Sequence, residues 1–173
     1  MALDGRRLAP EEMIEIVKHW CADYPVLSVE DPVAQHDADG MRAVTEALGS
    51  KVQIVGDDFL VTDAARVRSA ASLEACNCAL IKVNQAGTVT RAHAAFLAAR
   101  KAGWAAIVSA RSGETEDVLL SHLATGWNAG QIKVGSFARS ERMAKWNELL
   151  RIEEAMGANA TFAGWSAFPG LRR

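Results

Sequence analysis

Five short apolar runs recur along this chain, and a charged side chain follows each of them. The charged residues succeed one another at intervals of between 22 and 29 residues, which leaves room for one helix between consecutive runs. Strands joined through helices run parallel, so the pattern predicts a parallel α/β sheet. The runs are 26–29, 52–55, 79–81, 105–108 and 131–132, and the charged residues are Glu30, Asp57, Lys82, Arg111 and Lys133.

Helix signals lie between the runs and also flank them. Pro10 with two acids in the first turn opens a leading helix, and Tyr24 with Pro25 ends it. Asp63 favours the amino end of a later helix, and Gly103 is typical of a helix stop. Beyond the leading helix, the expected helices span 39–48, 63–72, 88–101, 114–125 and 140–156.

The count of units limits the possible architectures. About five βα units follow the leading helix, whereas a closed (βα)8 barrel needs eight units and typically about 250 residues. The chain therefore forms an open, flavodoxin-like sheet or a half-barrel, or it is the later part of a larger barrel protein. Because no repeat or linker divides the 173 residues, we expect one domain.

The carboxyl ends of parallel strands carry the active site in sheets and barrels of this kind. Glu30 and Asp57 follow neighbouring strands, and carboxylate oxygens from two strand ends suit a hard divalent cation such as Mg²⁺. The alternative for each acid alone is a solvated loop carboxylate that caps a helix. Several strand ends that behave alike favour a metal site.

Two lysines and one loop supply cations at the same rim. Lys82 interrupts an apolar strand, and proximity to a metal or a second cation would disfavour its ammonium form, as a general base requires. Lys133 repeats this arrangement and could provide the second cation or stabilise an oxyanion; a structural salt bridge is the alternative for both. Arg111 and Ser112 could bind carboxylate or phosphate, although their loop also reads as a capped helix start. We interpret Arg139 and Arg142, near the start of the last helix, as a solvated or salt-bridged face, with a substrate role as the alternative.

Composition excludes several classes of function. The net charge of −2 and the pI near 6.1 provide no basic surface for a phosphate backbone, so we expect no nucleic-acid partner. Three sparse cysteines are typical of reduced thiols rather than of a zinc site. The start lacks a signal-peptide core and no run reaches membrane-spanning length, so the cytoplasm is the expected compartment.

Taken together, the motifs closely resemble the carboxyl-terminal barrel half of the enolases, the phosphopyruvate hydratases, from about residue 8 to residue 164. The resemblance implies a partial (βα)8 TIM-type barrel domain over 1–164, followed by a carboxyl-terminal tail over 165–173. The matching segments are YPVLSVEDP at 24–32, QIVGDD at 53–58, IKVNQ at 81–85, RSGETED at 111–117, QIK at 131–133, RSER at 139–142 and NELLRIEE at 147–154.

The resemblance also implies roles for individual residues in the Mg²⁺-dependent dehydration of 2-phosphoglycerate to phosphoenolpyruvate, a step of glycolysis. Glu30 and Asp57 match Mg²⁺ ligands beside the substrate, and Lys82 matches the base that removes the proton next to the carboxylate. Lys133 matches a substrate-binding lysine that faces the same carboxylate. The implied substrate is thus a small phosphorylated hydroxy acid, and the implied phosphate contacts are Arg111 and Ser112.

Two departures from the enolase pattern keep other functions open. Ala110 stands where enolases carry a histidine, which leaves room for an enolase-like carboxyphosphonoenolpyruvate synthase of phosphonate biosynthesis. In the family, an amino-terminal domain, the first barrel strands, a third metal-binding acid and the general-acid glutamate precede the matching region. A truncated chain of this kind could also be a non-catalytic module, so we expect a homo-oligomer or pairing with a chain that supplies the missing barrel half.

Overall fold

A computed structural model describes residues 2–3 and 5–171 of the chain. Its centre is a parallel sheet of five strands in the order β3-β4-β5-β6-β7, so each strand pairs with its neighbours in sequence. This confirms the predicted parallel α/β sheet. The strands are β3 (Ser28–Glu30), β4 (Gln53–Gly56), β5 (Cys78–Ile81), β6 (Ala105–Ser109) and β7 (Gly130–Lys133).

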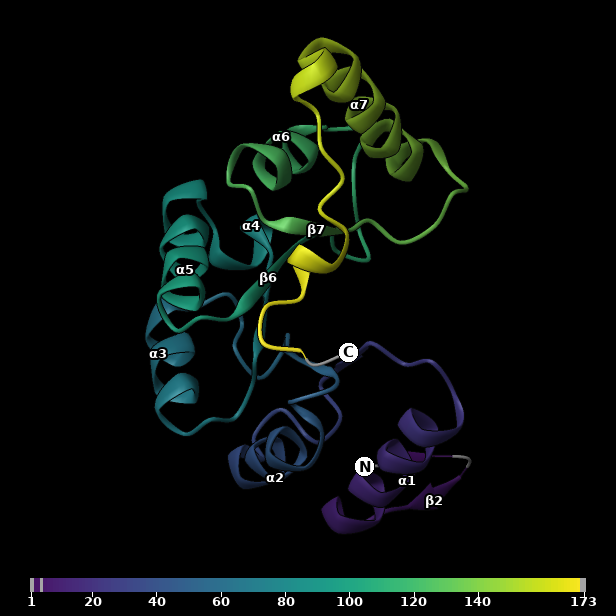
Figure 1. The fold of residues 1–173 in the computed structure, drawn as a ribbon, viewed down its shortest axis with the longest axis vertical. Helices are drawn as coiled ribbons and strands as arrows, with labels where there is room; N and C mark the ends of the chain where they lie inside the picture. Colours follow the sequence, from purple (N-terminus) through teal and green to yellow (C-terminus); the bar gives the residue numbers. More distant parts are fainter. Residues whose placement is uncertain (1, 4, 172–173) are drawn as a thin grey trace.

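Helices connect the strands and cover one face of the sheet (Figure 1). The predicted preference of Asp63 for a helix start is explained by its carboxylate, which accepts hydrogen bonds from two backbone N–H groups of the first turn of α3. Thr88, for which no cap was predicted, accepts the backbone N–H of Arg91 at the start of α5. The longer helices are α1 (Pro10–Asp23), α2 (Ala38–Leu48), α3 (Ala64–Ser72), α5 (Val89–Lys101), α6 (Leu119–Gly126) and α7 (Ser140–Met156).

The expected start of the helix at 114–125 is wrong, because α6 begins only at Leu119. Two acids of this segment accept backbone hydrogen bonds outside a first helical turn at 114. The Glu114 carboxylate accepts the backbone N–H of Arg111 at 2.7 Å, which holds the chain in a loop. The Asp117 carboxylate accepts the N–H of Leu119 at 2.9 Å and so favours a helix start at that point.

Short elements were not predicted, because they hold too few residues to show a periodic pattern. β1 (Ala2–Leu3) and β2 (Arg6–Arg7) form an antiparallel hairpin, and α4 (Val83–Ala86) is a single turn directly after β5. In the carboxyl-terminal segment, the 3₁₀ turns η1 (Gly157–Asn159) and η2 (Gly164–Ala167) follow α7.

The carboxyl-terminal segment runs back from α7 across β7, as the yellow trace in Figure 1 shows. The Gln131 side chain donates a hydrogen bond of 2.7 Å to the carbonyl oxygen of Ala167, and Ala167 is buried. The proposed division between a domain over 1–164 and a tail over 165–173 stays a prediction. The 3₁₀ turn η2, most of which lies beyond residue 164, still packs against β7.

Side-chain contacts between distant strands show that the sheet is curled. In a flat sheet β3 and β7 would lie about 19 Å apart, four strand spacings. Instead the Lys133 ammonium lies 2.6 Å from the Glu30 carboxylate, and the amides of Gln53 and Gln131 exchange hydrogen bonds of 2.8 and 3.1 Å. The strands therefore form a half-barrel of the TIM type, as predicted.

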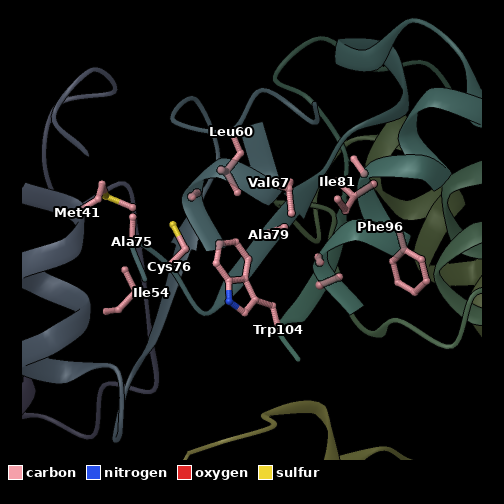
Figure 2. Close-up of a cluster of buried hydrophobic side chains, with 14 of the residues drawn as sticks. Met41, Ile54, Leu60, Val67, Ala75, Cys76, Ala79, Ile81, Phe96 and Trp104 are labelled. Carbon is pink, nitrogen blue, oxygen red and sulfur yellow. The ribbon is translucent and has the colours of Figure 1, made fainter. Parts of the chain in front are cut away.

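Buried side chains lie on both faces of the curled sheet. On the outer face, Ile54, Ala79 and Ile81 pack with residues such as Val67 and Phe96 of the covering helices (Figure 2). On the inner face, alternate residues of the same strands form a separate apolar cluster of Val55, Cys78, Leu80, Ala105 and Ile107. Successive side chains of a strand point to opposite faces, and this alternation decides which of them reach the interior of the half-barrel.

Candidate functional site

The side chains at the carboxyl ends of the strands continue the alternation of the inner face. Asp57 follows Val55 by two residues, and Lys82 follows Leu80 by two residues, so both lie above the inner apolar cluster. A cleft of about 730 Å³ opens there. All six predicted site residues border it, which brings them together: Glu30, Asp57, Lys82, Arg111, Ser112 and Lys133.

The acids and lysines of the cleft form two ion pairs. Lys82 Nζ lies 2.5 Å from Asp57 Oδ2, and both side chains are about nine-tenths buried. Lys133 Nζ lies 2.7 and 2.6 Å from the two carboxylate oxygens of Glu30, in a more exposed position. Each ammonium thus neutralises one carboxylate, and four strand ends contribute to the arrangement.

Asp57 retains one oxygen for a further partner. Its Oδ1 is buried and accepts no hydrogen bond from any other part of the described chain. An unpaired buried carboxylate oxygen is unfavourable unless a cation or a donor fills the place beside it. The oxygen therefore fits a bound cation or a ligand donor.

The donors fit a hard cation with few protein ligands. Glu30 and Asp57 could hold Mg²⁺ through carboxylate oxygens, and Mg²⁺ commonly combines one or two carboxylates with water and substrate oxygens. Within residues 2–3 and 5–171, no group of three or more His, Cys, Asp and Glu side chains is arranged to hold a metal. Three carboxylates border the cleft, those of Glu30, Asp57 and Asp58, and the first two are the predicted ligands.

Asp31 supports the strand end that carries Asp57. Its carboxylate accepts the backbone N–H groups of Asp57 at 3.0 Å and of Asp58 at 2.7 Å. Its φ of 39° lies in the left-handed region, which is unusual for a residue other than glycine. Burial raises the pKa of Asp31, although the two accepted hydrogen bonds oppose this effect. Sequence reasoning missed Asp31, and its position next to Glu30 was the available signal.

The loop after β6 also borders the cleft. Arg111 and Ser112 are exposed there, and buried Ala110 borders the same space. Arg142 of α7 donates hydrogen bonds to the carbonyl oxygens of Ser112 at 2.7 Å and Val134 at 2.9 Å. The interpretation of Arg142 as a solvated or salt-bridged face is therefore wrong, because its guanidinium joins two loops of the rim.

A parallel half-barrel with carboxylates and cations at its strand ends is typical of the class of TIM-barrel domains. Comparison with protein families gives a match to the family described as Enolase, C-terminal TIM barrel domain, over residues 3–169. The chain belongs to this family. It therefore carries the domain of the enolase-superfamily lyases, which generally use Mg²⁺. No helix in the described ranges combines the length and apolar character that a membrane span requires.

Proposed function

We propose that the protein acts as a phosphopyruvate hydratase, which dehydrates 2-phosphoglycerate to phosphoenolpyruvate with Mg²⁺ in cytoplasmic glycolysis. One observation carries the proposal: the cleft brings Lys82 and Lys133 together with Glu30 and Asp57 from four separate strands. Family membership agrees with a lyase of this superfamily. The three cysteines are free thiols, which is typical of a reducing compartment.

In the proposed reaction, Lys82 is the base. Lys82 lies beside Asp57 as an ammonium, so it must first release a proton to solvent. As a neutral amine it then takes the proton from the substrate carbon next to the carboxylate, and the electron pair left on this carbon spreads into the carboxylate. The pair then forms the new carbon–carbon double bond while hydroxide leaves the neighbouring carbon. Lys133, which borders the same cleft, stabilises the negative charge that develops on the carboxylate. Mg²⁺ held by Glu30 and Asp57 would supply further positive charge there.

The loop after β6 would bind the substrate phosphate. Arg111 offers a planar pair of donors that suits phosphate oxygens, and Ser112 adds a hydroxyl group. Both residues border the same cleft as the ion pairs. A small phosphorylated hydroxy acid in this cleft could thus contact both the lysines and the loop.

Turnover by the purified chain tests the proposal. Formation of phosphoenolpyruvate from 2-phosphoglycerate and Mg²⁺ should fall by about 10²- to 10⁴-fold in Lys82→Ala, the range expected for loss of a general base. The control is Lys101→Ala, which removes an exposed lysine at the end of α5 and should leave the rate unchanged. A wild-type rate that matches the Lys82→Ala rate would remove the catalytic proposal.

A second candidate function is that of a carboxyphosphonoenolpyruvate synthase with the same fold. Ala110 supports it, because this small buried residue borders the cleft at the place of the enolase histidine. Ala110→His should raise the rate with 2-phosphoglycerate if the substrate is the conventional one. An unchanged or lower rate would favour a different ligand in the space beside Ala110.

We also propose that the chain associates through its sheet edges. β3 and β7 each pair with a single strand within the described chain, so each presents an edge to a second copy or to a chain that supplies further barrel strands. Such an assembly could serve as an interaction module without catalysis. Light scattering on the purified chain tests this idea, and a strictly monomeric, well-folded protein would contradict it.

A further inference from the structure

A buried ion pair lies beside the cleft but outside its wall. Lys145 of α7 is only 1% exposed, and its Nζ lies 3.3 Å from Glu114 Oε2. The same ammonium donates to the carbonyl oxygens of Thr115 at 2.8 Å and Glu141 at 2.9 Å. Its three hydrogens thus have three acceptors, which a lysine at this depth requires.

Glu114 connects this lysine to the loop after β6. Its other oxygen, Oε1, accepts the backbone N–H of Arg111 at 2.7 Å. No helix or strand includes residues 110–118, so the conformation of the loop depends on contacts such as this one and those of Lys145. The Asn84 amide donates a longer hydrogen bond, of 3.5 Å, to the same Glu114 oxygen. The carboxylate therefore ties the backbone of Arg111 to a fixed point on α7.

Arg142 adds a second restraint from the same helix. It precedes Lys145 by three residues, so the two side chains leave neighbouring positions on one helix face. Its guanidinium holds the carbonyl oxygens of Ser112 and Val134. Together these contacts fix the loop after β6 on both sides of the Arg111–Ser112 segment.

We propose that Glu114 and Lys145 are positioning residues, which hold Arg111 and Ser112 where they bind an anionic group of the ligand. This inference rests on the proposed function of the loop as the phosphate site. A buried ion pair is weak evidence for stability, since apolar residues of similar volume often stabilise a fold as well. Directional hydrogen bonds, in contrast, fix a loop to a fraction of an ångström, and small displacements of binding groups are costly.

The experiment distinguishes an effect on the position of the loop from an effect on the stability of the fold. Lys145→Met alone would leave the Glu114 carboxylate buried without its partner, so the informative variants are Glu114→Gln and the double variant Glu114→Met/Lys145→Met. We expect the double variant to keep its urea midpoint while its dissociation constant for inorganic phosphate rises about tenfold. Isothermal titration calorimetry measures the constant for each folded variant, and Glu114→Gln should weaken binding in the same direction.

Two comparisons decide the outcome. Arg151→Met removes an exposed cation of the same helix, which pairs with Glu148 at 2.9 Å, and should leave phosphate binding unchanged. Arg111→Ala should abolish binding at the loop. Wild-type affinity in the folded double variant would overturn the positioning role while leaving the proposed reaction intact. Phosphate binding that Arg111→Ala does not weaken would overturn both the role and the phosphate site, whereas the Lys82→Ala rate tests the chemistry separately.

Discussion

Replacing Lys82 with methionine tests the buried ion pair at the centre of the cleft. Lys82 and Asp57 each have side chains that are 10% exposed, and Asp57 Oδ1 is buried with no hydrogen-bond partner in the described chain. Methionine keeps most of the apolar stem, so the substitution removes mainly the ammonium group. Loss of one partner of a buried pair costs about 3 to 5 kcal/mol. Because the pair borders an open cleft, we expect about 2 to 3 kcal/mol here.

Urea unfolding followed by circular dichroism, in EDTA, measures this effect. With a slope of about 2 kcal/mol per molar urea, the midpoint should fall by about 1 to 1.5 M. The matched control is Lys18→Met, since Lys18 pairs with Glu15 at 2.7 Å on the surface, and its midpoint should stay unchanged. Asp57→Asn/Lys82→Met should recover part of the loss, because it leaves no unpaired charge. Equal midpoints for wild type and Lys82→Met would refute the reasoning.

Three further predictions concern packing, thiol reactivity and pH. Gly56→Ala would place a Cβ 2.6 Å from Leu60 Cγ, so we expect a loss of about 1 to 3 kcal/mol in urea unfolding; an unchanged midpoint would contradict this overpacking. Burial raises the pKa of the Cys76 thiol, so a thiol reagent at neutral pH should label Cys21 long before Cys76 in the folded protein, and equal labelling rates would contradict the structure. Burial also raises the pKa of Asp31, so folding favours the protonated carboxyl group. The resulting contribution to the free energy of unfolding is fully present below the ordinary pKa of Asp31 and is lost as the pH rises through its pKa in the folded protein. The stability difference between wild type and Asp31→Asn should therefore fall as the pH rises from about 4 toward neutrality, and a constant difference would count against the buried environment.

The sheet could be predicted because its strands are buried on both faces. A strand such as Cys78–Ile81 is apolar at every position, and the helix signals between such runs imply parallel pairing. The start of α6 could not be predicted, because Glu114 is as compatible with a first helical turn as with a loop. Its actual role depends on Lys145, which lies 31 positions further along the chain and shows no local signal.

The site shows the same division between local and long-range information. The residue types at the strand ends pointed to six side chains, and all six border one cleft, while their roles stay predictions. The partner of each charge could not be predicted, since Lys133 pairs with Glu30 across 103 residues. Asp31 and Arg142 were missed for a related reason: both act on backbone groups, and sequence patterns carry little information about backbone hydrogen bonds.

The alternation of side chains makes the fold and the cleft depend on the same property of the strands. Leu80 points into the inner cluster and Lys82 continues its face, so a shift of β5 by one residue would turn Lys82 away from the cleft and bring Ile81 into the interior. Burial of Ile81 against the helices on the outer face opposes such a shift. Apolar packing on both faces therefore keeps the register, and the register in turn keeps the ammonium group of Lys82 beside Asp57.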